Sequence, residues 1–362
     1  MTLRHLLSIA LWALLSISPI AWNTVSAQVP DSLHRWLGPQ EWRRDVDGPI
    51  LSLGKSGAFD DTHMFAPTVA VDEGRFLLWY CGSRGVAHDL SRQPVPDERV
   101  FSLGLATSAD GKRFEKYENN PVFSFDEHRL SILTPCVLRD SDGSILREDG
   151  KMRMWFSSAR FGAGGRPQAV GEMSSADGVH WSNASPSLLE KAYAPSVLKT
   201  PRGYEMWYTE PGKYPWRIRH ARSDDGKKWN VTDEPVLEIT QPWEHYILVY
   251  PSVLKIDGVY LMWYASYPHE DRETTAIGFA VSLDGVKWHK HPQNPVLRPD
   301  PARPWESHYV SSQSIIRLPD GSFRIWYASR KKPPFTNLYF ALNTARWVGP
   351  DAENRPSPSP GQ

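Results

Sequence analysis

A pattern of residues that recurs five times constrains the fold of this chain more than any other feature. Each copy begins with a short apolar segment, which has a Pro near its start in four copies, and continues through a turn to a Trp-aromatic pair. The five pairs are Trp79-Tyr80, Trp155-Phe156, Trp207-Tyr208, Trp263-Tyr264 and Trp326-Tyr327. Such a repeat indicates that each copy is one supersecondary unit that packs against its neighbours.

Two further segments complete the first four copies. The third segment ends in Ser-x-Asp-Gly, at residues 108–111, 175–178, 223–226 and 282–285. Asp-Gly favours a hairpin turn, because Gly adopts positive φ at no steric cost. An aromatic residue three positions later starts a fourth segment. Four short antiparallel strands, repeated five times, predict an all-β protein with the fold of a five-bladed β-propeller.

The last copy lacks its Ser-x-Asp-Gly turn and its fourth strand. Residues 42–51, which begin with Trp42 and contain Gly48-Pro49-Ile50-Leu51, have the fourth-strand pattern without the first three strands. We therefore expect this N-terminal strand to complete the last blade and close the ring, which leaves no open sheet edge. The propeller is predicted over residues 28–349, and the Pro- and Ser-rich residues 350–362 are predicted to be a disordered tail.

Residues 1–27 predict a cleaved signal peptide. They contain Arg4, an apolar run over residues 6–17, and the small residues Val25-Ser26-Ala27 before Gln28. We expect a secreted or periplasmic protein with no membrane association after cleavage. Cys81 and Cys136 either pair in that oxidising compartment or are two buried small side chains.

Charge disfavours some classes of partner. The chain has 41 Lys and Arg against 41 Asp and Glu, so its formal net charge is 0. No global charge draws it to nucleic acid or to an anionic membrane. The histidines do not have the spacing of a metal-binding motif, so we predict neither a metal nor another cofactor. We also expect a monomer.

Residues that recur at one blade position share one task, which is packing sheet against sheet. We therefore assign the Trp-aromatic pairs to the core. The aspartates of the Ser-x-Asp-Gly segments are assigned to turns on the face opposite the functional one: Asp110, Asp177, Asp225 and Asp284.

Chemistry is expected where the copies differ, in the segments that lead into the first strands. Four of these five lead-in segments carry an acidic side chain followed within three residues by His. The propeller gathers them around one central depression, where crowded carboxylates have the raised pKa that an acid/base pair requires. Alternatively, these side chains cap strand ends and bond each other's loops. The candidate catalytic residues are Asp60, Asp61, Glu127, Glu244 and Glu306.

Loops between second and third strands form the remainder of the predicted rim. They are basic, which suits a ligand with carboxylate, sulfate or phosphate groups, although exposed loop charges are commonly just solvated. Trp216 lies in such a loop and is the preferred sugar-stacking aromatic. The candidate substrate-binding residues are His63, Arg84, His128, Arg160, Trp216, His245, His308 and Arg330.

The motifs Ser-x-Asp-Gly-x-x-Trp, Asn-Pro-Val-Leu and Met-Trp-Tyr give the chain a resemblance to the five-bladed propeller glycosidases, glycoside hydrolase families 43, 32, 62, 68, 117 and 130. The resemblance implies the propeller fold and a carbohydrate partner. Family-43-type enzymes place Asp, Asp and Glu at the starts of inner strands. The matching positions here are not acidic, so those catalytic residues are not carried over: Ala66, Thr134, Ala194, Tyr250 and Ser312.

Together these features predict an exported glycoside hydrolase acting on a poly- or oligosaccharide, with an anionic one suiting the basic rim. Asp60 or Asp61 is expected as base or nucleophile and Glu244 or Glu306 as acid, with Glu127 tuning them. One alternative is a non-catalytic carbohydrate-binding propeller. A second is a glycoside phosphorylase, in which rim Arg and Lys bind the attacking phosphate.

Overall fold

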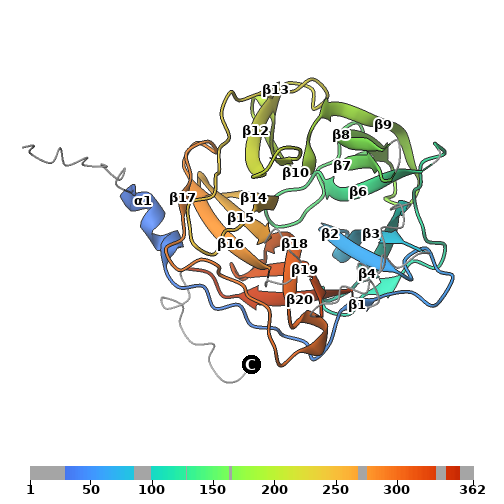
Figure 1. Ribbon diagram of the computed structural model, residues 1–362, viewed down its shortest axis with the longest axis horizontal. Coiled ribbons are helices and arrows are strands. Elements are labelled where there is room, and N and C mark those ends of the chain that lie inside the picture. The colour runs from blue at the N-terminus through green and yellow to red at the C-terminus, as the bar shows by residue number, and fades with distance from the viewer. Residues whose placement is uncertain are drawn as a thin grey trace, which may run out of the picture.

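The computed structural model describes residues 29–84, 99–127, 129–162, 165–267, 275–331 and 340–350. Its strands form five antiparallel sheets of four strands, arranged as blades around one axis (Figure 1). The predicted all-β, five-bladed β-propeller is confirmed. Within the described ranges, no helix is long and apolar enough to cross a membrane. The predicted signal peptide lies outside these ranges, as does the predicted tail apart from Pro350.

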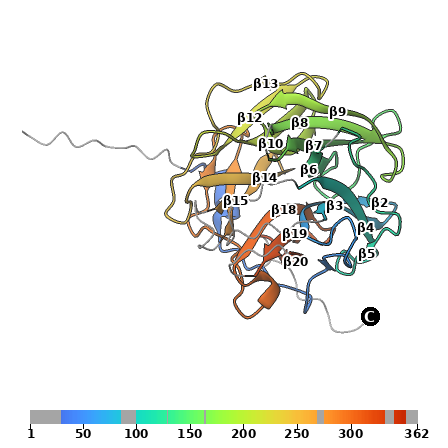
Figure 2. The ribbon, with the colours of Figure 1, turned by 45° about the vertical axis from the view of Figure 1, so that its right-hand side comes forward.

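Each blade runs from an inner strand at the axis to an outer strand (Figure 1), and Figure 2 shows the same ring from an oblique side. Blade one contains β2 (His63–Asp72), β3 (Arg75–Ser83), β4 (Phe101–Ser108) and β5 (Glu115–Lys116). Blade two contains β6 (Leu130–Val137), β7 (Met152–Arg160), β8 (Arg166–Ser175) and β9 (Trp181–Glu190). Blade three contains β10 (Tyr193–Thr200), β11 (Gly203–Glu210), β12 (Arg217–Ser223) and β13 (Asn230–Val231).

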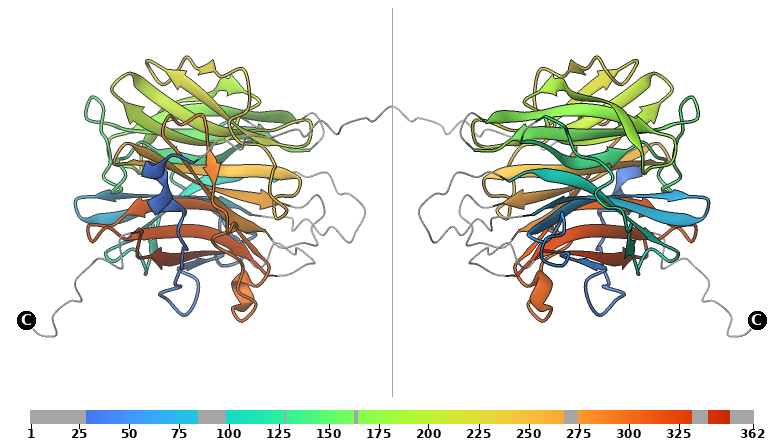
Figure 3. Two further views of the ribbon diagram at one scale, coloured as in Figure 1. Left: turned by 90° about the vertical axis from the view of Figure 1, so that its left-hand side faces the viewer. Right: turned by 90° about the vertical axis from the view of Figure 1, so that its right-hand side faces the viewer.

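Blade four contains β14 (Ile247–Ile256), β15 (Val259–Tyr267), β16 (Ala276–Ser282) and β17 (His289–Lys290). Blade five contains β18 (Tyr309–Arg317), β19 (Phe323–Arg330), β20 (Ala341–Trp347) and β1 (Leu51–Ser52). The short helices α1 (Asp31–His34) and η1 (Arg35–Leu37) lie on the outside of the ring beside blade four (Figures 1 and 3), and η2 (Pro304–Glu306) leads into blade five.

The N-terminal strand closes the ring as predicted. In β1, Leu51 pairs with Leu342 and Ser52 with Ala341 of β20, while Arg43 forms an isolated bridge to Arg346. Regular pairing is shorter than the expected residues 42–51, because Pro49 has no N–H to donate and Gly48 has a φ of 151°. Closure by one chain segment removes the exposed sheet edge that an open ring would have.

Blades are joined by a hydrogen bond from a buried Trp to a Gly carbonyl. The indole N–H of the second-strand Trp donates to the Gly of the Ser-x-Asp-Gly turn of the next blade, at 2.7–2.9 Å. The four pairs are Trp79–Gly178, Trp155–Gly226, Trp207–Gly285 and Trp326–Gly111. Each of these Trp side chains is fully buried. We call this contact the Trp–Gly latch.

The latch requires Gly for two reasons. The four glycines have φ between 70° and 77°, in the left-handed region that favours glycine. A Cβ at Gly285 would lie 2.7 Å from Cζ2 of Trp207, so the indole also needs the space. The Asp of the same motif stabilises the turn, since Oδ1 of Asp110 accepts the N–H groups of Lys112 and Arg113. These bonds lower the pKa of the Asp110 carboxyl.

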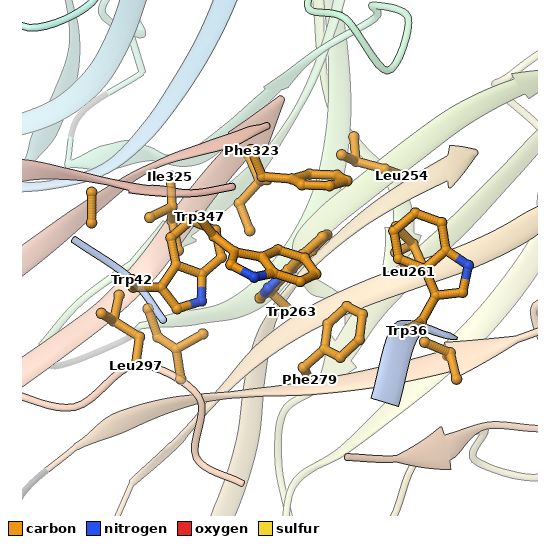
Figure 4. Packing of buried hydrophobic residues seen from close by; sticks show 14 of the residues in the cluster. Trp36, Trp42, Leu254, Leu261, Trp263, Phe279, Leu297, Phe323, Ile325 and Trp347 are labelled. Carbon is orange, nitrogen blue, oxygen red and sulfur yellow. The ribbon is translucent and has the colours of Figure 1, made fainter. Parts of the chain in front are cut away.

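The seam between blades four and five is built differently, because blade five has no Ser-x-Asp-Gly turn. Nε1 of Trp263 has no hydrogen-bond partner among the described residues. Instead, Trp42 of the N-terminal segment packs edge-on against Trp263 with ring centroids 6.4 Å apart, and lies 6.0 Å from Trp347 (Figure 4). Trp36 packs edge-on against Phe323 in the same cluster. The N-terminal segment therefore supplies both the last strand and the packing of the last seam.

Every inner strand contains a bulge at the same place. The pairing with the second strand shifts register there in all five blades. One residue at each bulge has φ between 44° and 55°: Ala66, Thr134, Ala194, Tyr250 and Ser312. In four blades the next residue is Pro, which has no N–H and so loses no ladder hydrogen bond at the bulge.

The two cysteines are both free thiols. Cys81 is fully buried, and Sγ of Cys136 accepts the N–H of Val197 from the neighbouring blade at 3.3 Å. Burial raises the pKa of both thiols. Cys81 is therefore a buried small side chain and Cys136 a half-buried one, and no disulfide joins them.

His220 is a buried polar residue of blade three. Its ring centroid lies 5.1 Å from that of Trp207, and neither ring nitrogen has a hydrogen-bond partner in the described part of the chain. Burial lowers the pKa of His220 to about 4. The folded protein therefore holds this imidazole neutral.

Replacing Gly285 with Ala should destabilise the fold by about 3 kcal/mol, because the methyl group adds a clash with Trp207 to the strain of positive φ. The matched control is Gly258→Ala, where φ is 81° but no atom lies within 4 Å of the added Cβ. This variant should lose only about 1 kcal/mol. Urea unfolding of both variants gives the comparison, and equal losses would show that the latch contributes no packing energy.

His220 should make the protein less stable as the pH falls from about 6.5 to 4. Its pKa is lower in the folded protein than in the unfolded state, so the unfolded state takes up more protons in this window. The loss should reach about 2 kcal/mol at pH 5 relative to pH 7. His220→Phe removes this titration, and its free energy of unfolding should change correspondingly less between the two pH values. An unchanged pH slope in the variant would assign the effect to other groups.

Candidate functional site

A central well opens at the axis, where the inner strands begin. It has a volume of about 270 Å³ and receives residues from all five blades. We define it by its lining residues: His63, Phe65, Arg99, Phe101, Leu133, Phe161, Gln168, Tyr193, Trp216, Ile247, Val249, Tyr250, Tyr309, Ser311, Ser312, Ala328, Arg330 and Phe340. The lining contains no carboxylate from the described residues. It combines aromatic rings with two arginines, one histidine and several hydroxyl groups.

His63 begins β2 and is held in one protonation state by its neighbours. Its Nε2 lies 3.0 Å from Nη1 of Arg99, and its Nδ1 lies 2.9 Å from Oγ of Ser83. Because a guanidinium can only donate, Nε2 must be the acceptor and Nδ1 carries the proton that it donates to Ser83. The neutral imidazole therefore has a fixed orientation in the lining of the well.

Two arginines lie over aromatic faces at the well. Cζ of Arg330 is 3.8 Å from the ring centroid of Tyr309 and 5.0 Å from that of Phe340. Cζ of Arg99 is 5.6 Å from the centroid of Phe161. Cation–π contact of this kind fixes the plane of a guanidinium while leaving it charged. The well therefore presents two oriented positive groups.

Blades three and four provide a second aromatic wall. The hydroxyls of Tyr193 and Tyr250 lie 3.1 Å apart, and Trp216 packs edge-on against Tyr193 with centroids 6.5 Å apart. Nε1 of Trp216 donates to the carbonyl of Gly212 at 3.2 Å. Trp216 is thus half-buried and lines the well.

Three of the five predicted catalytic carboxylates are buried in contacts within their own blades. In blade four, Oε1 of Glu244 accepts the hydroxyl of Tyr264 at 2.6 Å, and Nζ of Lys290 lies 2.6 Å from both carboxylate oxygens. Oε2 also accepts the N–H groups of Thr240 and Gln241. Glu244 is 4% exposed, so its hydrogen-bonding capacity is used inside the blade.

The same arrangement occurs in blades one and five. Oδ2 of Asp60 accepts the hydroxyl of Tyr80 at 2.9 Å and Nζ of Lys116 at 2.5 Å. In blade five, Glu306 accepts the hydroxyl of Tyr327 at 2.6 Å and Nε of Arg44 at 3.0 Å, and burial raises the pKa of its carboxyl. We call these three sets acid–Tyr–cation triads: Asp60–Tyr80–Lys116, Glu244–Tyr264–Lys290 and Glu306–Tyr327–Arg44.

The triads connect the elements of single blades, and they do not bring these carboxylates together at the axis. In each triad the acid comes from the lead-in segment, the Tyr from the second strand and the cation from the outer strand or the segment just before it. None of the three acids lines the well. The alternative interpretation, that these side chains cap strand ends and bond each other's loops, also differs from these contacts, which lie within each blade.

The other two predicted acids occupy different surroundings. Asp61 stabilises its own loop, accepting the N–H of Gly57 at 2.7 Å and the hydroxyl of Thr62 at 2.9 Å. Glu127 is exposed and forms an ion pair with Arg160. Both stand just before an inner strand, in blades one and two respectively. They are the two predicted acids that the triads do not engage.

The predicted substrate-binding residues divide into two groups. His63, Trp216 and Arg330 line the well, whereas Arg84 and His245 are exposed, and Arg160 and His308 are half-buried outside its lining. His128 lies outside the described residues, as do His88, Asp89 and Arg92 of the predicted rim and its residues 269–272. Within the described ranges, no group of three His, Cys, Asp or Glu side chains is placed to hold a metal ion.

Sequence reasoning missed much of the aromatic wall and one arginine. Phe101, Phe161, Tyr193 and Phe340 line the well, but their spacing in the sequence does not distinguish them from core aromatics. The place of Arg99 in the rim was predictable from the sequence, because this residue closely precedes β4 and therefore belongs to a loop between second and third strands.

Comparisons with known proteins identify relatives of this chain, although no family model matches it. It is 30% identical over 247 residues to the uncharacterized protein MT1551 of Mycobacterium tuberculosis strain CDC 1551 / Oshkosh, covering 64% of this chain and 76% of that protein. The uncharacterized protein Rv1502 of strain H37Rv matches with the same identity and the same coverage.

Solved structures with a similar fold include proteins described as glycoside hydrolases. A structure of BT0996, described as an RGII complex, matches with a TM-score of 0.66 and 17% identity, covering 86% of this chain and 93% of that protein. A glycosyl hydrolase from Bacteroides ovatus matches at 0.63 and 14%, with 91% and 97% covered. A structure from the GH130 family of mannoside phosphorylases and hydrolases matches at 0.61 and 15%, with 88% and 95% covered. At these identities the likeness concerns the fold.

Replacing a triad acid should cost stability. Glu244→Gln leaves Lys290 as a buried charge without a counter-ion, so we expect a loss of about 3 kcal/mol. Glu127→Gln is the matched control, because this side chain is 49% exposed and its ion pair should contribute less than about 1 kcal/mol. Chemical unfolding of both variants tests the assignment. A Glu244→Gln protein as stable as the control would remove the structural role of the triad.

Proposed function

This protein belongs to the family of the uncharacterized M. tuberculosis protein MT1551, and we propose that it is an exported, carbohydrate-active propeller whose central well binds an anionic saccharide. The observation that carries this proposal is the lining of the well, which joins aromatic rings to Arg99 and Arg330 and includes no described carboxylate. The fold it shares with propellers described as glycoside hydrolases also supports a carbohydrate ligand.

The chemistry of the lining suits a charged sugar. Aromatic faces pack against the apolar C–H face of a sugar ring, and the hydroxyls of Tyr193, Tyr250 and Tyr309 are placed to hydrogen-bond its oxygens. A guanidinium binds a carboxylate or sulfate with two parallel hydrogen bonds. Because the described lining residues include two arginines and no acid, the lining favours an anionic over a neutral ligand.

The size of the well limits what it holds. Its volume of about 270 Å³ is near the lower end of pockets for small molecules, roughly 300–1,000 Å³. It therefore suits one sugar residue with its charged group, and any longer ligand must extend beyond it. We propose that the protein works outside the cytoplasm as a monomer, with residues 1–27 removed as a signal peptide.

Hydrolysis of the bound saccharide is a second candidate, favoured by the position of Asp61 and Glu127. These acids stand at the starts of neighbouring blades, before β2 and β6, and neither belongs to a triad. In a hydrolase, one carboxyl protonates the leaving oxygen while the other activates water or attacks the anomeric carbon. The triads leave Asp60, Glu244 and Glu306 less suited to this chemistry. A phosphorylase would differ in requiring inorganic phosphate for turnover.

Removing a well arginine should weaken binding of an anionic sugar. With α-1,4-linked galacturonate oligosaccharides as the probe, Arg330→Gln should lower affinity tenfold or more, since a hydrogen bond to a charged group contributes about 1.5–3 kcal/mol. Isothermal titration calorimetry gives the dissociation constants.

Two controls accompany this measurement. Arg202→Gln changes an exposed arginine in the turn between β10 and β11 and should bind as the wild type does. Neutral galactose oligosaccharides should bind less tightly than galacturonates, and Arg330→Gln should reduce that difference. Equal affinity of the wild type for both sugars would contradict an anionic ligand.

Hydrolysis is tested with the two acids outside the triads. If the protein cleaves a bound oligosaccharide, Asp61→Asn or Glu127→Gln should lower kcat by a factor of about 100 or more while leaving binding nearly unchanged. Product release is followed by reducing-end assay, with and without phosphate. Binding without cleavage in the wild type would establish the non-catalytic function.

A further inference from the structure

A groove on blade three lies directly beside the central well. It has a volume of about 640 Å³ and is lined by Pro167, Gln168, Lys191, Glu210, Pro211, Gly212, Lys213, Tyr214, Pro215 and Arg217. We call it the blade-three groove. Gln168 lines both the groove and the well, so the two hollows share a wall. The groove is therefore adjacent to the well, and a ligand longer than one residue can extend from one toward the other only past this wall.

A stack of aromatic rings connects the two hollows. The ring of Tyr214, in the groove, lies parallel to that of Trp216, in the well, with an interplanar angle of 7° and centroids 5.6 Å apart. Tyr246 packs on Tyr214 with centroids 4.3 Å apart. Tyr214 is nevertheless 47% exposed. An exposed tyrosine fixed by two neighbouring rings is a preorganised contact surface rather than a mobile loop side chain.

The backbone beneath this stack is anchored between blades. Trp216 forms a parallel bridge to Ile247, and the N–H of Leu248 donates to the carbonyl of Trp216 at 3.1 Å. The segment that carries Tyr214 is thus attached to blade four as well as to blade three. Rings held this way keep a fixed position relative to the well.

The charge of the groove matches that of the well. Lys191, Lys213 and Arg217 line it together with one acid, Glu210. Glu210 pairs with Arg219 at 2.9 Å and Arg217 pairs with Glu238 at 3.3 Å, so the positive charge of the lining comes from the two lysines. Lys191 has a φ of 53°, a strained conformation of the kind that persists where the surrounding structure fixes it. The lining is therefore cationic, as required for a ligand whose successive residues each carry a negative charge.

We propose that the blade-three groove is a second saccharide subsite, so that the ligand is an anionic oligosaccharide with one residue in the well and the following residues across Tyr214 and Lys213. This inference rests on the proposed function and specifies its ligand class. A chain of uronate residues places a carboxylate on each ring, which the lysines of the groove pair with while Tyr214 contacts the ring faces.

The test is the dependence of affinity on chain length, measured by isothermal titration calorimetry with α-1,4-linked galacturonates of one to six residues. Wild-type affinity should rise at least tenfold between the monomer and the trimer. Tyr214→Ala and Lys213→Glu should each remove most of this rise while leaving monomer affinity within twofold of wild type. Tyr214→Phe, which keeps the ring, should retain the rise.

Matched controls address folding and nonspecific charge effects. Lys287→Glu reverses an exposed charge in a Ser-x-Asp-Gly turn, away from the groove, and should behave as the wild type. Thermal melting of each variant confirms that the propeller is folded. Arg330→Gln should weaken binding at every chain length, since it changes the well that all ligands occupy.

The outcomes separate the two proposals. Wild-type affinity that does not rise with length, or groove variants that keep the rise, would overturn the second subsite and leave the well intact. Equal losses for monomer and hexamer in Tyr214→Ala would also overturn it, since they would mean that Tyr214 acts only by supporting Trp216. Absence of any galacturonate binding by the wild type would contradict the proposed function itself.

Discussion

The Trp–Gly latch is the contact on which the rest of the structure depends. It joins four of the five seams with one buried hydrogen bond each, between an indole N–H and the carbonyl of a turn Gly. A buried indole N–H without a partner would carry a desolvation penalty, so the bond fixes how far apart neighbouring blades sit. Both residues of the latch lie in the repeated segments, which explains why these segments vary so little between copies.

The fifth seam shows what happens where the latch is missing. Blade five has no Ser-x-Asp-Gly turn, and the contact there is made by Trp36 and Trp42 from the start of the propeller. The same N-terminal segment provides Arg44 to the triad of Glu306 and β1 to the sheet. Ring closure, seam packing and the last triad are therefore coupled through one stretch of the polypeptide.

At the axis, each inner strand contains one residue in a backbone conformation that is unfavourable for residues with a side chain. Five residues other than glycine adopt positive φ there, each at a cost of about 1–3 kcal/mol. Hydrogen bonds between neighbouring blades stabilise two of these residues: Oγ of Ser312 accepts the N–H of Ala66 at 3.3 Å, and Oγ of Ser157 accepts that of Ala194 at 2.9 Å. Propeller glycosidases of the family-43 type, which this chain resembles, carry acids at these positions, whereas none of the five residues here is acidic and two of them, Tyr250 and Ser312, line the well.

The repeat predicted the fold, the ring closure, the core tryptophans and the turn aspartates, because each of these depends on local residue patterns. The lead-in acids were predicted as catalytic because the lead-in segments meet around the central depression, although the repeat also contained the signal for their contacts within each blade. Asp60 and Glu244 each precede a second-strand Tyr by 20 residues, and Glu306 precedes its Tyr by 21. Blade two has Phe156 in place of that Tyr and no triad. The aromatic wall was not predictable in this way, since Phe161 and Phe340 meet only once the ring has closed. Blade three departs furthest from the pattern: its lead-in contains Glu190 but no His, and only two residues connect β9 to β10. The blade-three groove, which we propose as the second subsite, lies at this departure from the repeat. It is therefore the difference between the blades that sets the side of the well toward which a longer ligand would extend.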